Sequence, residues 1–530
     1  MKEKIRSYIF NPGFILIVIF CIIFFTDGLN AMQHQLIGYD EGYNATVAAN
    51  QARHGEYRVS YPFEIPFYNM ITTGVPVLLP TAVLYRAFGI NYITSGIVPL
   101  IYMTLSIIVL WIAISKCFEN SKAGKFTASM LVLFLIISDK LIPIISTRLL
   151  GEGACILFLA LAWLLMAKGY SSKNNIPFFG AGFFVITTFL TKSATIFFLV
   201  SLIGIILFEA IIRNIKISNA ISFLMGLVGG FIVVDAFKFR ELEGYERWAD
   251  WWHMEWGNML DQSGQIAEMP TFNEKFAYLS EIFGTNKYVA LFSVLLPVLT
   301  YLAFLILKLR KKPINMDNAT YCGCLLAIAG SSLEIFYILF GGGGLSYERR
   351  HAVNEVFVKV FSLVLIGKLV LWLISKAKEK NYKYICALAA FSVLTIYAIV
   401  ALDMPGSVKN YIVKQHEDDY DLVLMREFLS EIDEISPDAK LYCNGWWQEP
   451  DISLFLDRDF EDLSELDPET VDTTESYFFI GRRSDTNTAK DAEDSYGIKL
   501  ERVNDIQVDY NDLNGYNSNE LFSIYRISSK

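Results

Sequence analysis

Charged residues are scarce in this sequence. They make up 19% of the 530 residues, whereas soluble globular proteins carry about 25%, and the shortage is concentrated before residue 404. Apolar runs of about 16 to 24 residues fill that part of the chain, and about 20 apolar residues are enough to cross a bilayer. The composition therefore excludes an ordinary soluble protein and predicts a polytopic, all-α transmembrane bundle.

Other absences narrow the function further. No basic stretch interleaved with aromatic residues suggests nucleic-acid binding. The five histidines show no metal-binding spacing. Six of the seven cysteines lie in or beside apolar runs and Cys443 stands alone, so no disulfide framework is expected.

The basic N-terminus sets the expected orientation. Lys2, Lys4 and Arg6 precede the first apolar run, at about 14–25, and no small-x-small cleavage site follows it. We therefore expect an uncleaved anchor with a cytoplasmic N-terminus.

The run at 74–88 decides the topology of everything that follows. It contains Pro76, Pro80 and Arg86, so it is too short and too interrupted to span, and we expect a helix on the outer surface. Ten more spans then follow, at 92–115, 126–145, 150–168, 176–191, 193–213, 217–238, 289–309, 318–340, 352–375 and 384–403. With this assignment the lysine- and arginine-rich loops are cytoplasmic, as the positive-inside rule requires, and about eleven spans are predicted.

The charge is divided between two parts of the chain. Residues 404–530 carry a net charge of −17 and residues 1–403 carry +7. We expect a transmembrane domain over 1–403, with outer loops at 26–91 and 239–288, and a soluble domain over 404–530 outside the membrane. The tail combines an amphipathic helix at 418–435 with strand-like runs at 440–443, 476–480, 499–508 and 521–527. This alternation predicts an extracytoplasmic α/β domain.

Two adjacent carboxylates follow the first predicted span. Asp40 and Glu41 have a glycine on either side and open a small-residue helical pattern that stops at Gly55. One interpretation is an Asp N-cap with Glu in the first turn, which stabilises a helix by about 1 kcal/mol. The other is a catalytic acid pair beside the lipid surface, and the residues alone leave both open.

Several other charges lie where topology does not require them. Arg148 and Glu152 are four residues apart, which on a helix places both on one face, as a local ion pair or as functional groups. Lys192, between two apolar runs, either extends to the interface or meets a partner such as a phosphate. Arg349 and Arg350, on the expected outer side, either grip a phosphate or pair with acidic side chains.

Tryptophans cluster in the 239–288 loop. Trp248, Trp251, Trp252 and Trp256 have helical spacing. They are typical of an interfacial aromatic belt, and sugar stacking is the alternative.

Taken in order, these short motifs resemble the lipid-phosphate-sugar-dependent glycosyltransferases of the GT-C superfamily, which include the protein O-mannosyltransferases and the bacterial aminoarabinose transferases. The matching pieces are Tyr39-Asp40-Glu41-Gly42-Tyr43, the Gly-Val-Pro-Val-Leu-Leu-Pro run at 74–80, Arg148 with Glu152, Phe189-Leu-Thr-Lys192 and Glu348-Arg-Arg-His351. The resemblance covers residues 8–403, and the tail matches only in placement.

The resemblance implies transfer of a sugar from a polyprenyl-phosphate donor to a lipid, glycan or protein acceptor. The site would lie at the outer face of the cytoplasmic membrane. A single displacement of this kind would invert the anomeric centre.

The same resemblance implies roles for individual residues. Asp40 would be the catalytic base, and Glu41 would support it or hold a divalent metal cation, the one cofactor considered. Glu152 would be the second acid, where aspartate is commoner in the family. The donor phosphate would be bound by Arg148, Lys192, Arg349 and Arg350, and Tyr39, Tyr43, His54 and His351 are candidates for substrate contacts.

Two other functions compete with this one. A lipid-linked glycan polymerase or ligase would rely on arginine–histidine pairs in a late outer loop. A transporter or flippase would need ionisable residues near midspan. Only Glu334, Lys359 and Lys368 qualify, and the sequence shows no partner for them.

Overall fold

The computed structural model describes residues 11–33, 37, 39–59, 66–67, 71, 73–118, 122–139, 141–172, 174–261, 271–283, 287–312, 316–340, 351–377, 420–435, 439–443, 454–456, 460–463, 466, 477–483, 493–511 and 517–529. Eight helices in this part of the chain are long and apolar enough to cross a membrane. They are α2 (Pro12–Gln33), α5 (Tyr92–Cys117), α8 (Glu152–Ser171), α10 (Ile196–Ile211) with the preceding 3-10 turn η1 (Ser193–Thr195), α11 (Ile217–Glu241), α14 (Lys287–Leu309), α15 (Asn318–Phe340) and α16 (Ala352–Ala377).

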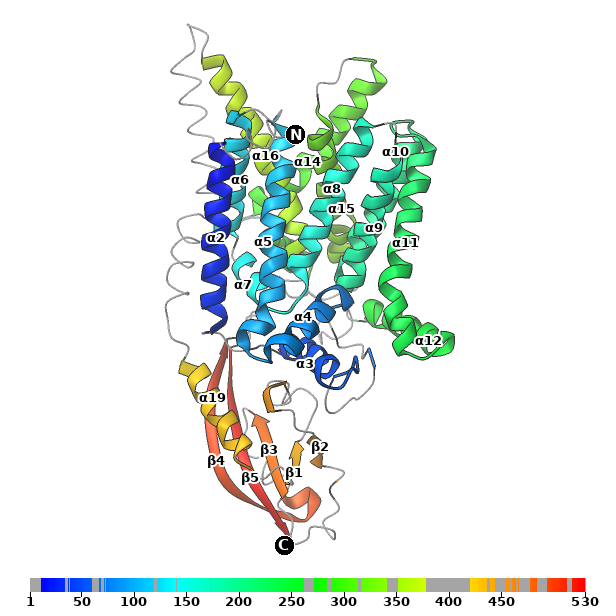
Figure 1. Cartoon of the computed structure of the whole chain (residues 1–530). Coiled ribbons are helices and arrows are strands. Elements are labelled where there is room, and N and C mark those ends of the chain that lie inside the picture. The colour runs from blue at the N-terminus through cyan, green and yellow to red at the C-terminus, as the bar shows by residue number, and fades with distance from the viewer. Residues whose placement is uncertain are drawn as a thin grey trace.

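These helices stand side by side in a bundle (Figure 1). Apolar side chains such as Ile22 and Ile232 are exposed on its outside, while Trp163 and Phe223 are buried in its core. An apolar outer surface is what a bilayer requires of a spanning helix. The chain is a multi-pass membrane protein.

Helices occupy ten of the eleven predicted spans, two of them through the shorter apolar helices α6 (Lys122–Ser138) and α9 (Ile176–Thr191). The eleventh span, 384–403, lies outside the described residues. The predicted span 126–145 was wrong at its end, because α6 stops at Ser138. There the Asp139 carboxylate accepts the backbone N–H groups of Leu141 and Ile142 at 2.9 and 3.2 Å and starts a separate short helix, α7 (Ile142–Thr147).

Short helices gather at one end of the bundle. The run predicted not to span is the helix α4 (Val75–Phe88), which lies at the same end as α3 (Tyr39–Arg53) and α12 (Tyr245–Asp261) (Figure 1). A further short helix, α13 (Phe272–Phe283), precedes α14. The chain therefore places its early loop helices and the tryptophan-rich helix α12 at a common end.

A five-stranded sheet lies beyond this end of the bundle (Figure 1). Its order is β2-β1-β3-β5-β4, parallel among the first three strands and antiparallel after that. The elements are α19 (Tyr420–Asp433), β1 (Lys440–Cys443), β2 (Phe460–Asp462), β3 (Tyr477–Arg483), β4 (Ile498–Asn511) and β5 (Asn517–Ser529). Four strands and the helix form where the sequence predicts them, and β2 was missed because it has only three residues. The Tyr92 and Phe455 rings, 4.8 Å apart, join the tail to the start of α5.

Glycines let α9 and α11 pack backbone against backbone. A Cβ atom on Gly182 would lie 2.0 Å from the carbonyl oxygen of Phe223, and one on Gly226 would lie 2.0 Å from that of Phe179. No side chain fits at either crossing point, so small residues set the distance between these helices.

We expect Gly226→Ala to lower the free energy of unfolding by about 1–3 kcal/mol, because the added methyl group must push the two helix backbones apart. Thermal unfolding of the purified protein in detergent measures this. The matched control is Gly204→Ala on α10, where an added Cβ would meet nothing within 4 Å. Equal behaviour of the two variants would contradict the close crossing.

Candidate functional site

The acid pair lies in the first turn of α3, so Asp40 is not an N-cap. Glu41 is buried, with 4% of its surface exposed. One of its oxygens accepts the backbone N–H of Leu149 at 3.3 Å, and the other lies 3.7 Å from Nη1 of Arg148. Glu41 therefore connects α3 to the segment between α7 and α8.

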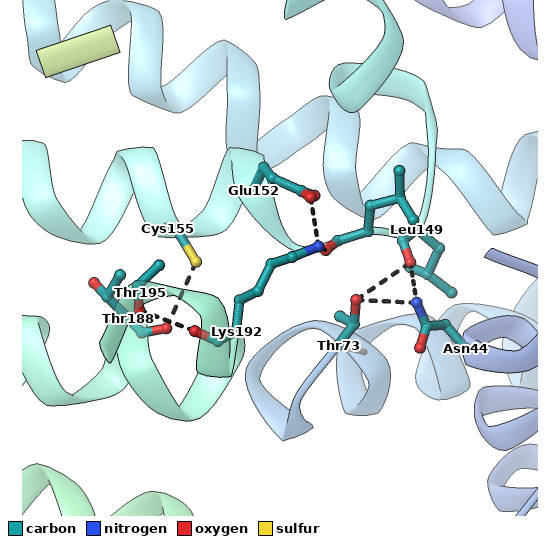
Figure 2. A network of polar contacts seen from close by, with 9 residues as sticks. Asn44, Thr73, Leu149, Glu152, Cys155, Thr188, Lys192 and Thr195 are labelled. Carbon is teal, nitrogen blue, oxygen red and sulfur yellow. Dashed lines mark hydrogen bonds and ion pairs between the residues drawn. The ribbon is translucent and has the colours of Figure 1, made fainter. Parts of the chain in front are cut away.

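A second polar residue on the same face of α3 reinforces this connection. The Asn44 amide donates to the carbonyl oxygen of Leu149 at 2.7 Å and to the Thr73 hydroxyl at 3.0 Å (Figure 2). Thr73 lies two residues before the start of α4. Sequence reasoning missed both residues, although the three-residue spacing from Glu41 to Asn44 was a usable signal.

The contacts of Glu41 and Asn44 form a polar network, and a buried ion pair beside them extends it. The Lys192 ammonium binds the Glu152 carboxylate and donates to the carbonyl oxygen of Leu150 at 2.9 Å (Figure 2). Glu152 is fully buried and Lys192 is 7% exposed. The second Glu152 oxygen is buried with no hydrogen-bond partner among the described residues. Lys192 thus joins the end of α9 to the start of α8.

Two of the alternatives that the sequence left open are excluded here. Arg148 does not pair with Glu152, because α8 begins only at Glu152 and Gly151 before it has a left-handed backbone with φ of +88°. Four-residue helical spacing therefore does not apply, and the two side chains meet Glu41 and Lys192 instead. Lys192 does not extend to the interface either, because a buried carboxylate satisfies it.

The other candidate site residues differ in burial and in position along α3. Asp40 is half-buried at the start of α3, Tyr43 is buried in that helix, and His54 is exposed just after its end. Tyr39 starts the helix, and its side chain lies outside the described residues, as do Arg349 and Arg350.

His351 belongs to a separate polar cluster. Its Nδ1 lies 2.5 Å from the Glu334 carboxylate, which also accepts the amide of Asn354. The expectation that the midspan charges lack partners was wrong. Lys359 pairs with Asp139 at 3.0 Å and Lys368 with Asp317 at 2.5 Å, because residues far apart in sequence meet across helices.

No group of three or more His, Cys, Asp or Glu side chains that could hold a metal ion occurs in the described part of the chain. Glu41 is engaged with Arg148 and the Leu149 N–H.

A pocket next to this network was not anticipated. It is lined by the start of α4, the end of α9, Ser193, and parts of α11 and α12. Asp235 on α11 accepts the indole N–H groups of Trp248 and Trp252, and the Lys238 ammonium lies 3.3 Å from the Trp251 ring centroid. The Lys238 ammonium also lies 3.3 Å from an Asp235 oxygen, so the tryptophans surround a buried Lys238–Asp235 ion pair.

Glu255 on α12 also lines this pocket, and burial raises the pKa of its carboxyl group. A raised pKa in the folded state means that this carboxyl contributes stability at low pH that is lost as the pH rises above its ordinary pKa. We therefore expect Glu255→Gln to raise the melting temperature relative to the unsubstituted protein by more at pH 8 than at pH 5, by about 1 °C or more. Glu246→Gln, at an exposed position on the same helix, is the control, and a pH-independent difference for Glu255→Gln would contradict the burial effect.

Comparisons with known proteins rest on structure alone. No protein-family model and no curated protein matches the sequence. The crystal structure of ArnT from Cupriavidus metallidurans bound to undecaprenyl phosphate matches with a TM-score of 0.57, and its apo state matches with 0.56. Each match covers 97% of both chains at 12% sequence identity. The chain has the fold of ArnT.

ArnT is an aminoarabinose transferase with the GT-C fold. The predicted resemblance to that superfamily is thus confirmed at the level of fold. The match with ArnT extends through the tail, which the sequence resemblance did not cover.

Proposed function

We propose that the protein is a glycosyltransferase that moves a sugar from a polyprenyl-phosphate donor to an acceptor at the outer face of the cytoplasmic membrane. The single observation that carries this proposal is that Glu41 of α3 meets Arg148 and Leu149, while Lys192 meets Glu152 of the same segment, in a chain with the ArnT fold. The ArnT crystal structure bound to undecaprenyl phosphate supports the class of donor.

Asp40 is the proposed base. It is half-buried in the first turn of α3, next to Glu41, whose oxygens lie beside the Leu149 N–H and Arg148. A carboxylate at this position can accept a proton from an acceptor hydroxyl. Direct attack of that hydroxyl on the anomeric carbon inverts the centre and needs no second nucleophilic carboxylate.

The remaining site residues take supporting roles. Arg148, which is partly exposed, is proposed to stabilise charge on the leaving phosphate together with Arg349 and Arg350. Glu152 and Lys192 are proposed to position the 148–152 segment, because their charges already satisfy each other within the bundle.

The proposed orientation rests on charge. The lysine- and arginine-rich loops favour a cytoplasmic N-terminus, and the site and the sheet would then lie outside. The acceptor would be a lipid, glycan or protein that approaches from that side.

The test is to incubate membranes containing the protein with labelled polyprenyl-phosphate sugars and to follow the label. We expect transfer of single sugar units to an acceptor and release of polyprenyl phosphate. Growth of a polymer would favour a polymerase or ligase, and movement of intact donor between leaflets without transfer would favour a flippase.

A further inference from the structure

A short segment of the tail, 454–456, reaches the end of the bundle that carries α3. Leu454 is fully buried and belongs to the hydrophobic cluster that also contains Ala45 and Ala49 of α3. Among the described residues of the tail, it is the one buried member of that cluster. A side chain of the tail therefore completes the core against which the helix with Asp40 packs.

The next two residues anchor this segment in the tail itself. Phe455 packs both against the bundle cluster that contains Leu454 and against the core of the sheet, and Leu456 packs against the core of the sheet. That second core is formed by α19 and the strands β1, β3 and β5. Three consecutive side chains thus join two hydrophobic cores, and close-packed cores transmit a displacement from one to the other.

Polar contacts with the tail lie on either side of α3 in the sequence. Arg426 on α19 donates to the carbonyl oxygen of Gln33, the last residue of α2, at 3.1 Å. Arg53, in the last turn of α3, donates to the carbonyl oxygen of Leu454 at 3.0 Å. The second of these bonds is partly buried, and a charged donor makes a stronger hydrogen bond than a neutral one. The tail therefore holds the chain before α3 and at the end of α3.

The composition of α3 explains why it depends on such contacts. Its buried face consists largely of alanines, and Val47 is its one branched aliphatic residue. Alanine offers few atoms for close packing, so large side chains of neighbouring segments must fill the space around the helix. Leu454 is one of these side chains, and it comes from a separate domain.

We propose that the tail positions the catalytic base: the 454–456 segment holds α3 in the orientation that sugar transfer needs, and Leu454 is the positioning residue. The inference rests on the proposed function for the role of Asp40. A displacement of about 1 Å at a reacting group can cost about 100-fold in rate. The loss of this contact should therefore lower turnover, and it should affect donor binding much less because Leu454 itself touches no donor.

The experiment compares two matched leucine substitutions in the full chain. Leu454→Ala is expected to lower kcat for a labelled polyprenyl-phosphate sugar at least about tenfold, with the donor KM changed by less than about threefold. Leu454→Met keeps most of the side-chain volume and should retain most of the kcat. The control is Leu463→Ala, which removes an equally buried leucine from a tail core that contains only tail residues among those described. Its kcat should stay within about twofold of the unsubstituted value.

Backbone hydrogen exchange reads the same contact without turnover. Leu454→Ala should speed exchange of the α3 amides at 45–53 at least about fivefold, because local opening becomes easier when a packing side chain is lost. Leu463→Ala should leave these amides unchanged. Arg53→Met removes one hydrogen bond and leaves both cores filled, so it serves if Leu454→Ala does not fold, and it should change kcat and exchange in the same direction.

The outcomes separate this inference from the proposed function. Unchanged kcat in folded Leu454→Ala protein would overturn the inference, and so would equal losses in Leu454→Ala and Leu463→Ala, because general loss of tail stability would then be the cause. Unchanged α3 exchange would also overturn it and would leave the proposed function standing. Absence of transfer by the unsubstituted protein would overturn the proposed function and, with it, the role given to Asp40.

Discussion

Asp40→Asn is expected to reduce sugar transfer at least about 100-fold, because a positioned general base contributes roughly 10²–10⁴ to the rate. The amide keeps the size and position of the side chain at the start of α3 but cannot accept the proton of an acceptor hydroxyl. Turnover of a labelled polyprenyl-phosphate sugar by purified protein measures the effect. Donor binding should change little, since the loss concerns the chemical step.

The control for Asp40→Asn is Asp250→Asn, an exposed aspartate on α12 at the same end of the bundle. It should transfer sugar at the unsubstituted rate. Undiminished transfer by a correctly folded Asp40→Asn variant would remove the catalytic role of the acid pair and with it the main support for the proposed mechanism.

Removing one member of the Glu152–Lys192 pair is expected to lower the free energy of unfolding by about 3–5 kcal/mol, because it leaves an uncompensated charge in a buried site. Glu152→Gln and Lys192→Met should each show this loss in detergent-based unfolding. The combined Glu152→Leu, Lys192→Met protein should lose far less than the sum of the two, because neither charge remains.

An exposed pair supplies the comparison. Arg247 and Glu243 lie 3.3 Å apart on the surface, with side chains 72% and 76% exposed. Arg247→Met should leave the unfolding midpoint unchanged, since solvent screens such pairs. Additive losses in the double Glu152–Lys192 variant would show that the two side chains act independently.

The helices could be predicted because a long apolar run that crosses a membrane has few possible structures other than a helix. The predicted spans 176–191 and 318–340 agree with α9 and α15 to the residue. The error at 126–145 arose because apolar residues continue on both sides of Asp139, and only the structure shows that this carboxylate accepts the N–H groups of Leu141 and Ile142 where a new helix begins. Hydropathy reports burial in lipid and not where a helix is interrupted.

The sequence predicted which residues belong to the candidate site, but not which of them contact each other. Glu41, Arg148, Glu152 and Lys192 were all singled out, but local spacing suggested a partner only for Arg148 and Glu152, and not the one that the structure shows. Glu41 meets Arg148 across more than 100 residues, and no local pattern specifies such a contact. Lys238 was missed because a lysine at the end of an apolar run is usually read as an interfacial anchor.

The glycine crossing of α9 and α11 has a consequence for the pocket that these helices line. Because Gly182 and Gly226 each lie against the carbonyl oxygen of the opposite helix, we expect these two helices to move as one body. Two walls of the pocket therefore keep a fixed separation, and any change in its width must come from α4 or α12.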